Sequence, residues 1–328
     1  MRDGLLEVAL ADVGQVEIGH RARELVVMDD HAQVLVDGHL GELVRGQPGV
    51  EQDQVGAELA EHCTPWVAVL AHLKGLKSAP QHALAIDRVT WTGEAVVAVV
   101  ADSRAAAEDG VALVEVEYEP LPVVTDIRTA LDEATPLIHP ELGDNLTFRR
   151  LHEQGEVDKV FAEAHTVVEA SFKTGRHTGV CLEPRSILAD YNPAEGQMTV
   201  HHSTQAPHMM QSIIARHLDL PEGKVRVICG DVGGSYGIKV HVYPDEMATA
   251  AIARAMGRPV KFIADRVESF ATDIHARDHE IDARIAVDGA GKILAIDVDD
   301  WTGIGPYSVY PRTSAIEGLW EVEDVRLI

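Results

Sequence analysis

A glycine-rich segment between two regular elements limits the folds open to this chain of 328 residues. The segment is Gly230-Asp-Val-Gly-Gly-Ser-Tyr-Gly-Ile-Lys239, with four glycines within eight positions. Because no Cβ atom blocks the way, backbone N–H groups of such a loop can approach an anion or another polar ligand. The spacing matches neither GxxxxGK[ST] nor GxGxxG, so a P-loop and a dinucleotide-binding turn are both excluded. A tight structural turn would explain the glycines about equally well.

Hydrophobic periodicity places this loop between a strand and a helix. The strand is KVRVICG, and the helix is predicted from about Asp245 to Met256, with Gly257 as its stop. Further predicted elements are a helix over 207–218 and two hairpins that turn at 192–196 and 288–291.

The part of the chain before residue 123 is predicted to hold a compact β-β-α-β unit. RVTWTGEAVVAVVADS predicts two short strands around Gly93, SRAAAEDGVALV a helix with a serine cap, and VEVEYEPLP an edge strand. Residues 1–65 differ, because they contain no Lys, Phe, Tyr or Trp. Since large apolar side chains make cores, this segment is expected to be poorly specified, with a small β-rich subdomain as the alternative.

Composition argues against several classes of function. The chain has 28 basic and 53 acidic residues, and its formal charge of −25 argues against binding to nucleic acid or to an anionic membrane surface. No apolar run is long enough to span a bilayer and no secretory signal is present, so a cytoplasmic protein is expected. The three cysteines form no CxxC pair, which argues against an iron–sulfur or zinc site and favours buried thiols.

Short motifs occur in a fixed order on both sides of the glycine-rich loop. They are Cys181-Leu-Glu-Pro-Arg185, Ser203-Thr-Gln-Ala-Pro207, Asp245-Glu246, Gly257-Arg-Pro-Val-Lys261 and Asp265-Arg-Val-Glu268. This set, over about Pro80 to Gly318, resembles the molybdenum-cofactor subunit of the xanthine dehydrogenase/aldehyde oxidase family, in its carbon-monoxide-dehydrogenase-like large-subunit type. That family has EPR, STQ-x-P, VGGGFG-x-K and RPV-K/R…R-x-E elements in the same order. Residues 84–122 look like its hammerhead domain.

The resemblance implies an α+β fold. A partial aldehyde oxidase/xanthine dehydrogenase a/b hammerhead unit is followed by the first half of a molybdopterin-binding domain. The expected division is a poorly specified segment over 1–65, an incomplete hammerhead-like unit over 66–127, a linker over 128–150, and the N-terminal half of the cofactor-binding domain over 151–328. The family continues into a second half with further pterin contacts and a glutamate base, so a truncated or frame-disrupted chain is expected.

The resemblance also implies roles for single residues. Gln205 matches a glutamine whose amide hydrogen-bonds an oxygen ligand of molybdenum, and it is a candidate for both catalysis and cofactor binding. Tyr236 stands where the family usually has Phe beside the substrate, and it is the second catalytic candidate. The loop whose backbone N–H groups approach the cofactor corresponds to Gly233, Gly234, Ser235, Tyr236 and Gly237. No protein ligand to the metal is expected, because the family holds molybdenum through pterin sulfurs.

For the complete enzyme the resemblance implies oxidation of an aldehyde, an N-heterocycle or a similar small substrate. A molybdenum-bound hydroxide would attack the substrate carbon while hydride is transferred. The implied cofactor is molybdenum-molybdopterin, expected as the cytosine dinucleotide. No iron–sulfur or flavin group is expected on this chain, and the partners are an iron–sulfur subunit and an FAD subunit. The alternative is a non-catalytic fragment or assembly module that binds no metal by itself.

The candidate residues also have structural alternatives. Gln205 could cap the helix that starts near Pro207, and Tyr236 could be a core residue. Neighbouring imidazole and charged side chains are expected to be structural or partly exposed; they are His201, His202, His208, Glu183 and Arg185. The last two are expected to form an ion pair or backbone contacts.

Overall fold

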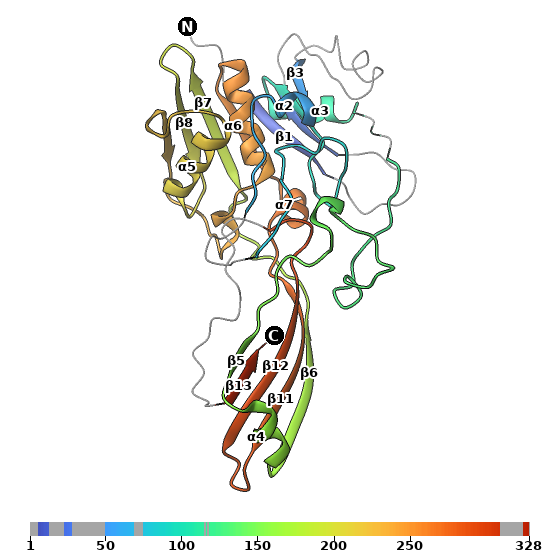
Figure 1. The fold of residues 1–328 in the computed structure, drawn as a ribbon. Coiled ribbons are helices and arrows are strands. Elements are labelled where there is room, and N and C mark those ends of the chain that lie inside the picture. Colours follow the sequence, from blue (N-terminus) through green and yellow to red (C-terminus); the bar gives the residue numbers. More distant parts are fainter. Residues whose placement is uncertain are drawn as a thin grey trace. The chain divides into compact units, whose positions relative to one another are not determined.

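The computed structural model describes residues 6–12, 23–27, 50–68, 75–114, 116, 118–308 and 324–327. The chain divides into two compact units. The first consists of Met1–Val67, Pro80–Pro120 and Thr178–Ile274, and the second of Ala68–Ala79, Leu121–His177 and His275–Ile328. Both units combine helices with sheets of mixed polarity, as the α+β prediction requires (Figure 1).

The first unit is built on a sheet with the strand order β3-β4-β2-β1-β10-β7-β8-β9. Its strands are β1 (Leu6–Asp12), β2 (Arg23–Val27), β3 (Val50–Val55), β4 (Val97–Ala101), β7 (Ser186–Asn192), β8 (Gln197–His202), β9 (Val225–Ile228) and β10 (Val260–Ile263). Every residue of β4 is buried, as a continuous apolar run of five residues predicts for a central strand. The predicted hairpin at 192–196 is present, with Gly196 in the left-handed region.

Two helices of the first unit, α3 (Arg104–Val111) and α6 (Pro244–Met256), have the caps that the sequence predicts. The unit also contains α2 (Gly56–Leu59), α5 (Pro207–His217) and α7 (Arg266–Thr272). Ser103 accepts a hydrogen bond from the N–H of Ala106 at the start of α3, and Gly257 ends α6 at a φ of 64°. Helix α6 lies against β7 and β10, and α5 lies against β9 (Figure 1).

The second unit is a five-stranded sheet in the order β5-β13-β12-β11-β6. Its elements are β5 (His152–Gln154), α4 (Val157–Glu163), β6 (Thr166–Thr174), β11 (Asp278–Val287), β12 (Ile293–Gly303) and β13 (Asp324–Leu327). The predicted hairpin of β11 and β12 turns at Asp288, whose carboxylate accepts from the N–H groups of Ala290 and Lys292. Figure 1 shows β6, β11 and β12 as long neighbouring strands.

Two predicted strands of the hammerhead region are absent from the part of the chain that the structure describes. Only β4 forms in the segment around Gly93, and the described residues of 114–122 lie in no strand. Gly93 has a φ of +106°, and a Cβ there would lie 2.8 Å from the carbonyl oxygen of Ala271. This glycine therefore permits the close approach of α7 and does not form a hairpin turn. The edges of the described sheet belong to β3 and β9, and the described residues of 114–122 pair with neither.

Residues 1–65 contribute β1, β2 and β3 to the first unit's sheet, and α2 follows β3 directly. Residues 1–5, 13–22 and 28–49 lie outside the described residues, so weak packing of the segment stays a prediction. Among the described residues, no helix has the length and apolar character needed to cross a membrane. Cys63 and Cys181 are buried thiols as predicted, whereas Cys229 is only half-buried.

Candidate functional site

The glycine-rich loop connects β9 to the short helical turn η4 (Ile238–Val240), which precedes α6. Three of its residues adopt positive φ: Gly234 at 102°, Tyr236 at 51° and Gly237 at 86°. Glycine reaches this region freely, but a bulky side chain does so rarely, and such conformations concentrate at functional sites. Tyr236 is 79% exposed, so the interpretation of this residue as part of the core is wrong.

Hydrogen bonds within the loop leave three consecutive donors unused. The N–H of Gly234 donates to Val232 at 2.9 Å, and that of Ile238 donates to Ser235 at 2.9 Å. The N–H groups of Ser235, Tyr236 and Gly237 donate to no group among the described residues. Because most backbone N–H groups in folded proteins are paired, three neighbouring unpaired donors are suited to an external acceptor.

Gln205 lies beside this loop, in the turn between β8 and α5. Its backbone N–H donates to the carbonyl of Lys239 at 2.9 Å, and the Thr204 hydroxyl donates to the same carbonyl at 3.1 Å. The residue is exposed, and its carboxamide has no partner in the described part of the chain. The N-cap of α5 is Ala206, with no side-chain cap hydrogen bond, so the helix-cap interpretation of Gln205 is wrong.

The three glycines among the predicted site residues differ in what a Cβ at the same position would meet. A Cβ at Gly233 would lie 2.6 Å from the Cβ of Glu183, so only glycine fits there. A Cβ at Gly234 would lie in ordinary contact with Cys181, 3.7 Å away. A Cβ at Gly237 would meet nothing within 4 Å. The loop is therefore closely packed at Gly233 and open at Gly237.

Sequence reasoning gave no role to the ion pair that closes this loop. Glu183 accepts a hydrogen bond from the N–H of Gly233, and its second carboxylate oxygen lies 3.2 Å from Nζ of Lys239. The Lys239 side chain is fully buried. The motifs could have indicated this pair, because both of its members belong to them. Glu183 lies in the Cys181–Arg185 motif, and Lys239 is the last residue of the glycine-rich segment.

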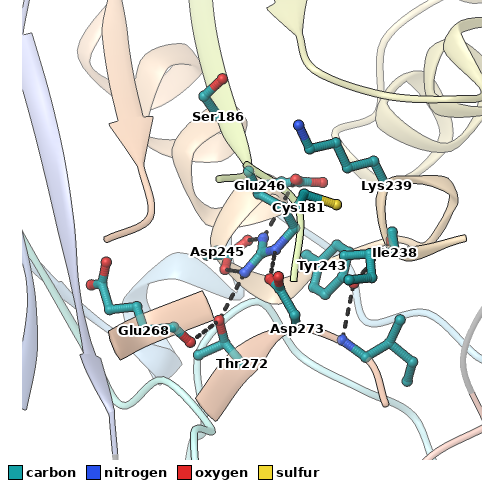
Figure 2. Close-up of polar contacts among 12 residues, drawn as sticks. Cys181, Ser186, Ile238, Lys239, Tyr243, Asp245, Glu246, Glu268, Thr272 and Asp273 are labelled. Atoms are coloured by element: carbon teal, nitrogen blue, oxygen red, sulfur yellow. Dashed lines mark hydrogen bonds and ion pairs between the residues drawn. The ribbon is translucent and has the colours of Figure 1, made fainter. Parts of the chain in front are cut away.

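Arg185 does not form an ion pair with Glu183 but pairs with carboxylates of α6 and of the residue after α7. The expected alternative, a backbone contact, is present for Glu183 at Gly233. The guanidinium of Arg185 is fully buried and lies within hydrogen-bond distance of Asp245 at 2.5 and 2.6 Å and of Asp273 at 2.6 Å. It also lies 3.4 Å from Glu246. Figure 2 shows Asp245, Glu246 and Asp273 close to one another, with Tyr243 nearby.

The electrostatics of this cluster keep the guanidinium charged. Burial alone would lower the pKa of Arg185, but the neighbouring carboxylates raise it well above the usual value. Burial also raises the pKa of Tyr243, whose ring lies 3.7 Å from the guanidinium carbon. The cluster joins β7, α6 and the end of α7, and it holds the strand that follows Glu183 in place.

The histidines near Gln205 do not form a metal site. His202 is buried with Nε2 at 3.0 Å from Glu246, whereas His201 and His208 are exposed. Within the described ranges, no three His, Cys, Asp or Glu side chains are grouped closely enough to hold a metal ion. Only the start of the loop, Gly230 to Val232, lines an open depression of about 250 Å³, and none of the six predicted site residues lines it.

Comparison with known proteins places this architecture in a family. Residues 138–323 match the molybdopterin cofactor-binding domain, and this match covers more than half of the chain. The chain belongs to the molybdopterin cofactor-binding family. Residues 55–122 match the aldehyde oxidase and xanthine dehydrogenase a/b hammerhead domain. The predicted xanthine dehydrogenase/aldehyde oxidase family and the predicted fold class, a hammerhead unit with part of a molybdopterin-binding domain, are confirmed.

Relatives within this family are named as hydroxylases, dehydrogenases and oxidoreductases. The chain is 34% identical to the nicotine 6-hydroxylase large subunit of Paenarthrobacter nicotinovorans over 82% of this chain and 33% of the relative. It is 33% identical to the carbon monoxide dehydrogenase large chain of Hydrogenophaga pseudoflava over 66% of this chain and 28% of the relative. The chain thus spans about a third of the length of these relatives.

The whole of this chain is similar in structure to part of a solved member of the family. Quinoline 2-oxidoreductase from Pseudomonas putida 86 matches with a TM-score of 0.86 and 32% identity, over 100% of this chain and 40% of that one. The roles of Gln205 and of the loop residues Gly233 to Gly237 stay predictions. The geometry adds that Gln205 and the loop meet at the Lys239 carbonyl.

Proposed function

We propose that Gln205 and the loop over Gly233, Gly234, Ser235, Tyr236 and Gly237 hold a molybdenum-molybdopterin cofactor. The chain would then be the cofactor-binding portion of a molybdenum hydroxylase. One observation carries the proposal. Three consecutive backbone N–H groups of the loop and the exposed carboxamide of Gln205 have no partners among the described residues, and the Gln205 backbone is hydrogen-bonded to Lys239 at the end of the same loop. Such a set of donors suits a cofactor that presents oxygen acceptors and negative charge.

The residues present fit the group. The N–H groups of Ser235, Tyr236 and Gly237 would donate to the cofactor, and the absence of a Cβ at Gly237 leaves room for its approach. Gln205 would donate through its carboxamide, and its backbone is held at the Lys239 carbonyl by a hydrogen bond. When bound, the cofactor would supply the oxidation of a substrate carbon, with removal of two electrons. The chain's contribution is the position and orientation of these donors.

The substrate proposal rests on Tyr236 and on the named relatives. The exposed ring of Tyr236 offers an apolar face to a flat substrate, and its hydroxyl adds a donor. The names of the relatives include nicotine and quinoline, which are N-heterocycles. We therefore propose an N-heterocycle or an aldehyde as the substrate class.

The remaining proposals concern the form of the cofactor and the partners. Several relatives are named as subunits or chains of larger enzymes. We propose that this chain works with an iron–sulfur subunit and an FAD subunit, which would carry electrons away from the site. The cytosine dinucleotide form of the pterin is part of the same proposal.

The test is the pterin and molybdenum content of the chain when it is produced in a host that makes the cofactor. The parent chain should carry pterin, and Gly237→Val should carry much less. Gly143→Val is a matched control, because Gly143 has a φ of 84° and, like Gly237, nothing within 4 Å of its Cβ position. Absence of pterin from the parent would contradict the proposal and favour a non-catalytic module that binds no metal. Equal loss in both variants would show that backbone strain alone explains the result.

A further inference from the structure

We infer that Glu183 is a positioning residue that holds the glycine-rich loop at two places, Gly233 and Lys239. The inference rests on the proposed function, because it concerns the shape of the loop that would receive the cofactor. Glu183 itself is not among the residues proposed to touch that cofactor. Its role would be to hold the loop so that the N–H groups of Ser235, Tyr236 and Gly237 stay unpaired.

The first contact of Glu183 is with Gly233 of the loop. Its backbone N–H donates to the carbonyl of Gly233 at 3.1 Å, and its carboxylate accepts from the N–H of the same glycine. Both polar groups of the Gly233 backbone are therefore held by one residue. The absence of a Cβ at Gly233 permits this approach, since a Cβ would lie 2.6 Å from that of Glu183.

The second contact is with the end of the loop. The other carboxylate oxygen lies 3.2 Å from Nζ of Lys239, whose side chain is fully buried. The N–H of Lys239 donates to the Ser235 hydroxyl oxygen at 3.2 Å, and its carbonyl accepts from the N–H of Gln205 at 2.9 Å. A single carboxylate thus connects Gly233, Lys239 and, through the Lys239 backbone, Gln205.

The segment that carries Glu183 is itself fixed on both sides. Arg266 donates to the carbonyl of Cys181 at 2.7 Å and to that of Leu182 at 2.9 Å. Arg185, two residues after Glu183, is held by the buried carboxylates. A carboxylate on a fixed backbone can impose a position on a flexible loop, whereas one on a mobile loop cannot.

The clamp explains why the three donors remain unused. A loop rich in glycine would otherwise be free to turn its N–H groups toward internal carbonyls. With Gly233 and Lys239 both held, the residues between them have to bulge outward, and Tyr236 takes a positive φ of 51° as part of that path. The strain at Tyr236 is thus borne by contacts outside the loop.

The test is amide hydrogen exchange in the full chain, measured residue by residue by NMR without any cofactor. In Glu183→Ala the Gly233 amide should exchange about tenfold faster or more, because its acceptor is removed. The amide resonances of Ser235, Tyr236 and Gly237 should also shift. Glu183→Gln is the milder variant, which keeps an acceptor for Gly233 but not the charge that faces Lys239. It should shift the amide resonance of Lys239 while leaving Gly233 largely protected.

Ile252→Val is the control for a general loss of stability, because Ile252 is fully buried in α6 and takes part in none of the hydrogen bonds or the ion pair of this clamp. It should lower the melting temperature without changing the loop amides. Exchange at Gly233 in Glu183→Ala that matches the parent, or that matches Ile252→Val, would overturn the inference. Since no cofactor is present, these results are independent of the pterin content that tests the proposed function.

Discussion

Two polar regions of the first unit, the cluster around Arg185 and the glycine-rich loop, differ in how their hydrogen bonds are used. Around Arg185, every guanidinium nitrogen faces a carboxylate or hydroxyl oxygen, and the group is fully buried. In the glycine-rich loop, three consecutive N–H groups donate to none of the described residues. The first arrangement is what a structural cluster requires, because an unpaired buried charge is costly. The second is available for a ligand.

The largest effect on stability is expected when the cation is removed from the cluster around Arg185. Arg185→Met should lower the free energy of unfolding by about 3–5 kcal/mol, because buried carboxylates would lose their shared partner. Urea unfolding of the full chain measures this change. Arg226→Met is the control on an exposed residue of β9 and should change stability by no more than about 0.5 kcal/mol. Equal effects of the two substitutions would mean that the cluster does not stabilise the unit.

A smaller effect on stability is expected at Gly233, where the loop lies against Glu183. Gly233→Ala places a Cβ 2.6 Å from that of Glu183 and should cost about 1–3 kcal/mol of stability through overpacking. Gly230→Ala is the matched control, since nothing lies within 4 Å of its Cβ position. Thermal unfolding of both variants beside the parent gives the comparison. A tolerated Gly233→Ala would show that Glu183 and the loop are not in close contact.

The cluster around Arg185 should also make stability depend on pH, through the carboxylate of Glu246. Burial alone would raise the pKa of Glu246, but His202 at 3.0 Å and then Arg185 hold it below its usual value. The pKa is thus lower in the folded chain, so the unfolded chain binds more protons as the pH falls. The stability that Glu246 contributes is complete above its unfolded pKa and is lost as the pH falls through the folded pKa.

The variant Glu246→Gln removes this titration. Its melting temperature should therefore fall less steeply than that of the parent between about pH 6 and about pH 3. Glu222→Gln, on an exposed residue of the turn before β9, should keep the parental slope. An unchanged slope in Glu246→Gln would show that this carboxylate does not carry the acid sensitivity.

The sequence could predict the elements whose signals are local. Helix α6 has Pro244 at its start and Gly257 at its stop, and the hairpin at Asp288 has its turn residues in place. The order of the motifs, with Gln205 before the glycine-rich loop, was enough to indicate the family. These features depend on spacing along the chain, which the sequence displays directly.

What could not be predicted depends on contacts between distant residues. The hydrogen bond from Gly233 to Glu183 joins residues 50 positions apart, and the one from Arg185 to Asp273 spans 88 positions. The prediction of a turn at Gly93 was wrong for the same reason, because glycine is required there by the close approach of Ala271 in α7. Such pairs follow from the tertiary fold, and no local pattern specifies which charges will meet.

The most direct test of the account is Gln205→Ala, measured for stability and for pterin content together. Because the carboxamide has no partner in the described chain, unfolding should change by no more than about 0.5 kcal/mol. Pterin and molybdenum content should fall, since a hydrogen bond to a charged group contributes about 1.5–3 kcal/mol. We expect the melting temperature of Gln205→Ala to equal that of the parent and its pterin and molybdenum content to be lower. A lowered melting temperature with parental cofactor content would contradict the account.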